Sequence, residues 1–118
     1  MFGLFGISEE KIQKWTQKGK INNVLRAADN TKPEIRKAAI TALGEFDVDE
    51  AFNYLVVTLR DPNPEIRILA AKALGTQGKA LAVEHLRHVS LKDDDEEVKK
   101  VAVDALKAID VPLVDEEE

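Results

Sequence analysis

The two histidines of the chain, His85 and His88, are the residues best suited to do chemistry. They lie three positions apart, and Glu84 lies four positions before His88, so a helix would present all three on one face. Imidazole and carboxylate groups at this spacing can bind a transition metal, but such a site needs three or four converging ligands. The chain has no cysteine and no third histidine to complete the set. We therefore expect no metal here and interpret the group as a polar face that gains charge below neutral pH.

Two further motifs have simple structural interpretations. Residues 75–79 (Gly-Thr-Gln-Gly-Lys) resemble part of a phosphate-binding loop, but Ala80 replaces the serine or threonine that such a loop requires. The acidic run at 93–97 lacks the central glycine of a calcium loop and directly precedes a helical pattern, so we expect it to cap that helix. Neither serine, Ser8 or Ser90, has a base beside it. The sequence therefore predicts no catalytic residue and no cofactor, and we do not expect an enzyme.

A repeat of about 31 residues defines the elements that position these side chains. The motif Pro-Glu-Ile-Arg at 33–36 recurs at 64–67, and a third, diverged copy is centred on Val98. Each copy begins a run of apolar residues at i, i+3, i+4, i+7 and i+8, which is the spacing of an amphipathic helix. A second helical pattern lies between successive copies. The sequence predicts seven helices, at 9–18, 20–29, 33–44, 49–61, 64–75, 79–91 and 96–109.

The expected helix ends carry recognisable signals. Ser8 can cap the first helix with its hydroxyl group. Gly44 and Gly75 each follow an Ala-Leu pair, and we expect both to end their helices in a left-handed conformation. The third copy has Lys107 at this position, so its helix is expected to continue to about Ile109.

The segment 61–67 (Asp-Pro-Asn-Pro-Glu-Ile-Arg), followed by Ala-Ala-Lys-Ala-Leu-Gly at 70–75, resembles a HEAT repeat of the short subtype found in phycobilin lyases. The resemblance implies an all-α fold, a right-handed α-solenoid of stacked antiparallel helix pairs that forms a single domain over residues 1–118. Helix pairs would occupy 9–29, 33–61 and 64–91, and a terminal half repeat would occupy 96–109, between an apolar segment at 1–8 and an acidic tail at 110–118.

The same resemblance implies a ladder of polar contacts along the stack. It is formed by the acidic residue that ends one helix pair and the basic residue that opens the next. The corresponding positions are Asn30 and Arg36, Asp61 and Arg67, and Asp93 and Lys99. Because Asn30 and Lys99 depart from the usual aspartate and arginine, we expect a ladder that weakens toward both ends.

The resemblance also implies that the second helix of each pair lines a concave inner surface. We therefore predict a partner-binding face that consists of Asn53, Tyr54, Val57, Glu84, His85 and His88. Tyr54 and Val57 stand beside the stripe of core residues on their helix. The two residues are either an exposed anchor for a partner or side chains that adjacent helices partly cover.

These expectations favour a non-catalytic protein-protein interaction module or adaptor, whose protein partner the sequence does not identify. One alternative, by resemblance alone, is an accessory subunit or regulator of an enzyme such as a tetrapyrrole lyase. A second alternative is nucleic-acid binding through the basic half, since residues 1–44 carry a net charge of +4 and residues 45–118 carry −9. The net charge of −5 for the whole chain makes nucleic acid the less favoured partner.

The composition excludes several classes of protein. No apolar run approaches the ~20 residues that a bilayer-spanning helix needs. The absence of cysteine excludes a disulfide framework and fits a cytoplasmic protein. With 44% hydrophobic and 33% charged residues, the chain is also too apolar for intrinsic disorder.

Both ends of the chain carry apolar residues. Phe2, Leu4, Phe5 and Ile7 precede a helix that contains Trp15 and several lysines. These residues either cap the exposed edge of the stack, which we favour, or contact an anionic membrane. At the other end, residues 111–114 (Val-Pro-Leu-Val) either fold over the last helix or leave an edge through which the chain forms a homodimer.

Overall fold

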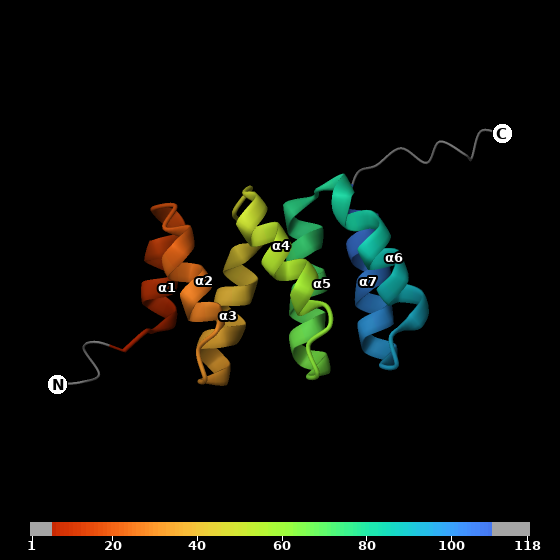
Figure 1. The fold of residues 1–118 in the computed structure, drawn as a ribbon, viewed down its shortest axis with the longest axis horizontal. Helices are drawn as coiled ribbons and strands as arrows, with labels where there is room; N and C mark the ends of the chain where they lie inside the picture. Colours follow the sequence, from red (N-terminus) through yellow and green to blue (C-terminus); the bar gives the residue numbers. More distant parts are fainter. Residues whose placement is uncertain (1–5, 110–118) are drawn as a thin grey trace.

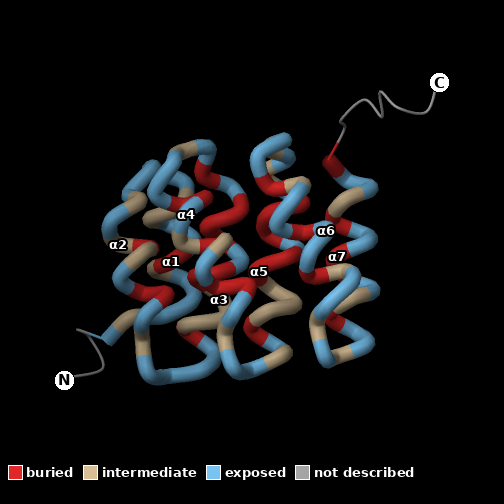
Figure 2. The backbone as a smooth tube through the Cα atoms, turned by 45° about the vertical axis from the view of Figure 1, so that its right-hand side comes forward, coloured by how far each residue is buried: buried red, intermediate tan, exposed pale blue. Residues whose placement is uncertain are grey.

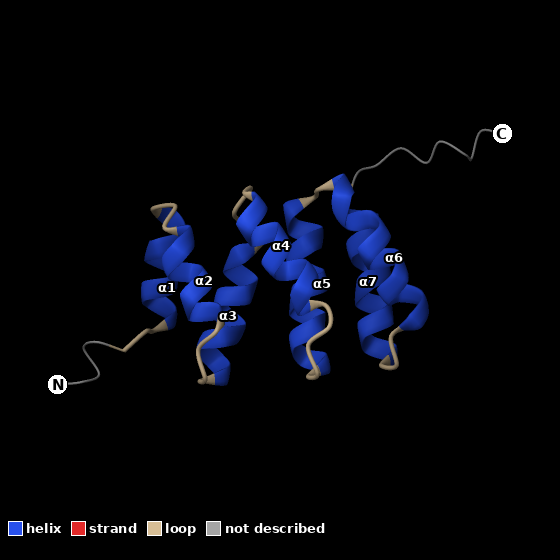
Figure 3. Cartoon of the chain, in the orientation of Figure 1, coloured by secondary structure: helices blue, strands red, loops and turns tan. Residues whose placement is uncertain are grey.

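The computed structural model describes residues 6–109, which form seven α-helices and one short 3-10 helix (Figure 1). Helices and the turns between them account for this part of the chain, and no strand occurs in it (Figure 3). All seven predicted helices are present within a few residues of their expected bounds. These bounds are α1 Glu9–Gln17, α2 Ile21–Ala28, α3 Pro33–Leu43, α4 Asp49–Thr58, α5 Pro64–Gln77, the 3-10 helix η2 Ala80–Ala82, α6 Val83–Lys92 and α7 Glu96–Ala108.

The helices form two layers of a solenoid. Helices α1, α3, α5 and α7 contact one another in succession and make up the first-helix layer. Helices α2, α4 and α6 make up the second-helix layer, and each packs against the first-layer helix that follows it in the sequence (Figure 1). The fold is therefore an all-α solenoid, as the repeat predicts.

The core runs between the two layers along the whole stack (Figure 2). Each apolar stripe of the repeat contributes to it, because no single helix pair can cover its own apolar face. The largest completely buried side chains are Ile12, Val24, Ile40, Leu43, Leu55, Ile66, Leu74, Leu86 and Val98. The hydrophobic pattern of the sequence therefore predicts the core correctly.

The first helix is closed by residues near the N-terminus. Ile7 and Trp15 are both half-buried and pack against the core. This packing agrees with the expected cap at Ile7. The other apolar residues of that segment, Phe2, Leu4 and Phe5, lie outside the described residues, as do residues 111–114.

Side chains cap the helix N-termini as predicted at both ends of the stack. The backbone N–H of Lys11 donates to the Ser8 hydroxyl at 3.1 Å, and that of Val98 donates to the Asp95 carboxylate at 3.0 Å. The acidic run at 93–97 therefore starts α7, and part of it holds the loop before that helix.

The two glycines of the Ala-Leu-Gly motif do not have the predicted left-handed conformation. Gly44 has a φ of −64°, and α5 continues through Gly75 to Gln77, where Gly78 adopts a φ of 71° and ends the helix. The motif glycines serve helix packing instead. A Cβ on Gly44 would lie 3.0 Å from the Cα of Ala73, and one on Gly75 would lie 3.1 Å from the Cα of Ala105. Glycine is needed here because the next helix backbone occupies the space of a side chain.

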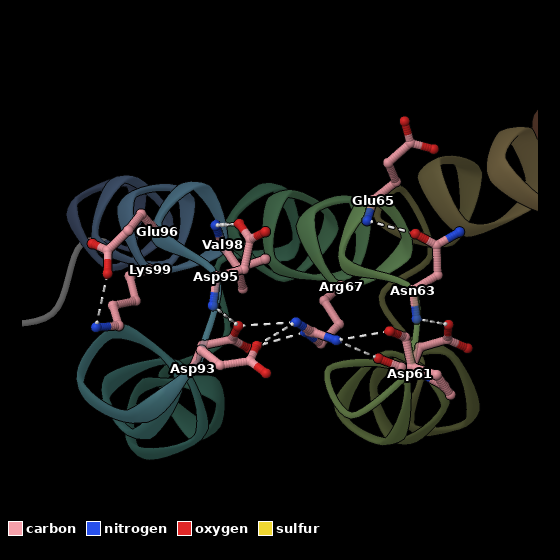
Figure 4. Close-up of polar contacts among 11 residues, drawn as sticks. Asp61, Asn63, Glu65, Arg67, Asp93, Asp95, Glu96, Val98 and Lys99 are labelled. Atoms are coloured by element: carbon pink, nitrogen blue, oxygen red, sulfur yellow. Dashed lines mark hydrogen bonds and ion pairs between the residues drawn. The ribbon is translucent and has the colours of Figure 1, made fainter.

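Arg67 is the centre of the predicted ladder (Figure 4). Its Nε and Nη2 atoms each donate to one carboxylate oxygen of Asp93 at 3.0 Å, and Nη1 donates to the carbonyl oxygen of Asp61 at 2.8 Å. The Arg67 and Asp93 side chains are only 12% and 9% exposed. One guanidinium group therefore joins the loop before α5 to the loop before α7.

A related bridge with a single hydrogen bond to the carboxylate occurs one repeat earlier, and no such bridge is found one repeat later among residues 6–109. Arg36 donates from Nη2 to Asp61 at 2.6 Å and from Nε to the carbonyl oxygen of Ala28 at 3.3 Å. Among residues 6–109, the only side-chain hydrogen bond of Lys99 is to Glu96, at 3.3 Å and on its own helix. The ladder is therefore weaker at its C-terminal end, as predicted.

Asn30, Asp61 and Asp93 share a second role in their loops. Each accepts a hydrogen bond from the backbone N–H two residues later, at 2.8 to 3.0 Å. Asn30 performs this role without a charge, and no basic side chain in residues 6–109 donates to it. The N-terminal end of the ladder therefore retains the turn and lacks the ion pair.

Replacing Asp61 with asparagine is expected to lower the free energy of unfolding by about 2 kcal/mol at pH 7. Burial alone would raise the pKa of the Asp61 carboxyl, but hydrogen bonds from Arg36 and the Asn63 backbone, with the charge of Arg36, hold that pKa below its usual range. The ionised form therefore stabilises the native state above the unfolded pKa of about 3.9, and this contribution is lost as the pH falls through the lower folded pKa. Urea unfolding at several pH values measures it.

The difference between the native chain and the Asp61→Asn variant should stay constant above about pH 5 and shrink below about pH 4. A difference that is the same at pH 3 and pH 7 would show that the carboxylate charge does not contribute.

Candidate functional site

A groove of about 440 Å³ lies between α4 and α6 in the second-helix layer. Apolar side chains and charged side chains both line it, from the facing sides of the two helices. The lining residues are Val56, Leu59, Arg60, Glu84, His85, His88, Val89, Lys92 and Asp93. Three predicted residues of the partner-binding face, Glu84, His85 and His88, therefore lie together on one wall.

The predicted residues on α4 lie beside the groove, and they differ in exposure. Asn53 and Val57 are exposed, and Val57 retains 71% of its accessible surface. An aliphatic side chain this exposed next to a groove is a candidate contact for a partner. Neither residue lines the groove itself.

Tyr54 is half-buried and faces the end of α2. Its hydroxyl group lies 2.7 Å from Oδ1 of Asp29 and 3.1 Å from the carbonyl oxygen of Ala28. Burial and the hydrogen bond to Asp29 raise the pKa of Tyr54 above its ordinary value. Of the two alternatives for this residue, the structure shows the covered one, in which Tyr54 fastens α4 to α2.

Glu84, His85 and His88 form one wall of the groove, here called the histidine wall. It is held by contacts within the second-helix layer. The His85 ring packs edge-on against the ring of Phe52 from α4, with centroids 6.5 Å apart and an interplanar angle of 69°. Glu84 forms an ion pair with Arg87 on its own helix. His85 and His88 are both exposed. The ring contact with Phe52 therefore holds His85 in place, and both imidazole groups remain accessible to a ligand.

The free charges of the groove are positive. Arg60 and Lys92 form no ion pair or side-chain hydrogen bond with any other residue between 6 and 109, and both are exposed. The acidic residues of the lining are engaged, because Glu84 pairs with Arg87, and Asp93 pairs with Arg67. The groove therefore attracts negative charge although the chain as a whole is acidic.

The sequence contains a partial signal for the two basic residues of the groove. Lys92 follows His88 by four positions and so shares its helix face. Arg60 directly follows Leu59, the buried residue after the end of α4. The predicted binding face omits both cations and the apolar floor made by Val56, Leu59 and Val89. These side chains come together only because α4 and α6 lie next to each other.

The two layers differ in how closely their helices approach. Small residues let α3, α5 and α7 contact one another directly, whereas α4 and α6 make hardly any direct contact. The spacing of the helices therefore differs between the layers. That the second helices line a concave surface stays a prediction.

A larger hollow of about 610 Å³ lies in the first-helix layer, mainly between α1 and α3. Acidic residues such as Glu9, Glu34 and Glu45 line it, together with Lys37, which pairs with Glu65. None of the predicted site residues lines this hollow. We therefore take the groove between α4 and α6 as the candidate functional site.

Two further features of the described residues concern metal binding and membrane spanning. Between residues 6 and 109, no group of three or more histidine, aspartate or glutamate side chains is arranged to hold a metal ion. None of the helices in this range is long and apolar enough to span a bilayer.

A family model described as HEAT repeats matches residues 21–107, from the start of α2 almost to the end of α7. This range covers more than half of the chain and all three residues of the histidine wall. No curated protein matches the sequence.

Proposed function

Because the chain belongs to the HEAT-repeat family, we propose that it is a non-catalytic adaptor that binds a protein partner through the groove between α4 and α6. HEAT repeats generally mediate protein-protein interaction. The proposed contact residues are Asn53, Val57, Glu84, His85 and His88 with Arg60 and Lys92, and Tyr54 positions α4 beside them. The phycobilin-lyase subtype remains a prediction.

The observation that carries this proposal is the combination of an exposed aliphatic side chain with two basic side chains that form no ion pair with another residue between 6 and 109. Val57 is 71% exposed on α4, and Arg60 and Lys92 line the groove. Apolar side chains next to a hollow supply contact area, and charged rim residues supply specificity and orientation. Arg60 and Lys92 meet the second requirement.

The ladder adds rigidity to this surface. Arg36 and Arg67 fix the loops at which the second helices end, and Tyr54 ties α4 to α2. A surface that is already ordered loses little conformational entropy when it binds. The solenoid is thus suited to present the groove in one fixed form.

The double variant Val57→Glu, His88→Glu tests the proposal by affinity capture from a lysate of the source cells. We expect a partner that the native chain retains to be lost, because both substitutions place carboxylates at the groove, whose free charges belong to Arg60 and Lys92. Both positions are exposed, so the helical circular dichroism should be unchanged.

The double variant Thr41→Glu, Thr76→Glu is the matched control, since both residues are exposed in the first-helix layer. It should retain the partner. If native and groove-variant chains retain the same proteins, or if neither retains any, the proposed binding mode is wrong.

A further inference from the structure

The basic end of the groove is the feature from which its occupant can be deduced. Lys92 is the last residue of α6, and Arg60 follows the end of α4 by two residues. Helices α4 and α6 run in the same direction in successive helix pairs, so both cations lie at the same end of the groove (Figure 1). The other end, at the start of α6, carries Glu84, which is paired with Arg87.

The floor of the groove is apolar between these two ends. Val56 and Leu59 line it from α4, and Val89 lines it from α6. A ligand that matches this surface carries apolar side chains first and carboxylates second, in the direction from the start of α6 to its end. A cationic ligand would leave Arg60 and Lys92 without partners and place like charges together.

Residues 110–118 of the chain have this order. Their sequence is Asp-Val-Pro-Leu-Val-Asp-Glu-Glu-Glu, so three aliphatic residues precede four consecutive acidic ones. The segment follows α7, which is antiparallel to α6 because only residues 93–95 join the two helices. Ile109, the residue before this segment, therefore lies near the first turn of α6, at the end of the groove opposite to the two cations.

The segment is also long enough to reach them. Nine extended residues span at most about 30 Å, whereas the ten residues of α6 span about 15 Å. The remaining length allows the chain to cross over the start of α6. The acidic residues then arrive at Arg60 and Lys92 after the aliphatic residues have passed over Val89.

We propose that residues 110–118 bind in the groove of their own chain, with the aliphatic residues on the apolar floor and Asp115 to Glu118 at Arg60 and Lys92. The segment is thus an internal ligand that a partner must displace. This inference deepens the proposed function and rests on it for the role of displacement: the partner is expected to offer an apolar segment followed by carboxylates.

The outward face of α7 is the competing place for the same segment. Val103, which is 39% exposed, lies there with Lys100 and Lys107 beside it. In the preceding helices α3 and α5, the equivalent residues Ile40 and Ala71 are completely buried. This face belongs to a single helix, whereas the groove has two walls and a floor, so we favour the groove.

A spin label distinguishes the two places in the full chain. Since the sequence has no cysteine, Glu118→Cys provides a unique site for a nitroxide, and Asp115, Glu116 and Glu117 remain. We expect the amide signals of His88, Lys92 and Arg60 to be broadened more strongly than those of Lys100 and Val103. The measurement compares signal intensities with the nitroxide oxidised and reduced.

Charge reversal tests the proposed contacts. In the variant Arg60→Glu, Lys92→Glu, the broadening at the groove should fall to the level seen in α1, and 1 M salt should weaken it in the parent chain. The matched control Lys100→Glu, Lys107→Glu should keep it. Stronger broadening along α7 than along α6, or no difference between them, would overturn the proposal.

A mixture of isotope-labelled chains without nitroxide and unlabelled chains with nitroxide tests whether the contact is intramolecular. Broadening of the groove signals in this mixture would assign the contact to a second copy and overturn the internal ligand. The measurements involve no partner protein. A failure here therefore leaves the capture experiment unaffected, and a failed capture leaves this contact unaffected.

Discussion

Replacing Arg67 with alanine is expected to lower the free energy of unfolding by about 3 kcal/mol. The substitution removes both hydrogen bonds to Asp93 and leaves that carboxylate, of which only 9% is exposed, without a cation. It also frees the carbonyl oxygen of Asp61. An unpaired charge in a nearly buried position costs more than the ion pair contributes, because its desolvation is no longer compensated. Urea unfolding followed by circular dichroism measures the effect.

Lys99→Ala is the matched control, because Lys99 occupies the equivalent position in the next repeat. In the described part of the chain its only ion pair is with Glu96, whose side chain is 88% exposed, so the loss should be below about 0.5 kcal/mol. Arg36→Ala should fall between the two, since the Arg36 side chain is 30% exposed. Equal losses at Arg67 and Lys99 would show that the ladder does not hold the repeats together.

The ladder illustrates what a repeated sequence can predict. The positions of Asp61, Arg67 and Asp93 follow from the period of about 31 residues, and the seven helices follow from the spacing of apolar residues within each period. Both are local patterns that recur, so each copy supports the interpretation of the others. The direction of the contacts is not local. Arg67 forms an ion pair with Asp93 of the following loop, whereas in its own loop it donates a hydrogen bond to the carbonyl oxygen of Asp61 and not to its carboxylate.

Tyr54 shows where prediction of the site fails. An aromatic residue beside a core stripe has the same sequence pattern whether it is free to anchor a partner or is already bound within the chain. Its acceptors, Ala28 and Asp29, are 26 and 25 residues away, and nothing in the spacing links them to Tyr54. The structure supplies that link because α4 packs next to the end of α2.

Arg60 and Lys92 show the complementary limit. A basic residue at the end of a helix is common, because it complements the helix dipole, and taken alone it predicts no site. The two become a shared feature only when α4 and α6 lie next to each other with their ends aligned (Figure 1). The histidine pair and Glu84 could be found from the sequence because they share one helix face.

The close approach of the first-layer helices was not predictable for a related reason. It rests on Gly44 and Gly75, each of which lies against the backbone of the next first-layer helix. A glycine after Ala-Leu is also the usual signal of a left-handed helix end. The two roles use the same residue, so the sequence alone favours the commoner one.

Replacing Gly75 therefore gives the second large expected effect. Gly75→Val should lower the free energy of unfolding by about 3 kcal/mol, and Gly75→Ala by about 1 to 2 kcal/mol. The Cβ atom would lie 3.1 Å from the Cα and Cβ of Ala105, so α5 and α7 would have to separate. The loss with alanine is diagnostic because alanine is more favourable than glycine in a helix by about 1 kcal/mol. If Gly75 served only the local structure of α5, Gly75→Ala would therefore stabilise the protein.

Gly78→Ala separates backbone strain from helix packing. Gly78 has a φ of 71°, and a methyl group on it would meet no atom within 4 Å, so its substitution should cost only about 1 kcal/mol of backbone strain.

The double variant Gly75→Ala, Ala105→Gly tests the contact between the two helices. The change at Ala105 removes one methyl group from the crowded pair but leaves the backbone of α7 close to the methyl group at position 75. Ala105→Gly should therefore destabilise the protein less in the Gly75→Ala background than in the native background, and equally in the Gly78→Ala and native backgrounds. If Gly75→Ala is neutral or stabilising by urea unfolding, α5 and α7 are not held at the distance that glycine permits. The close first-helix layer, which leaves the groove between α4 and α6 open, would then need another cause.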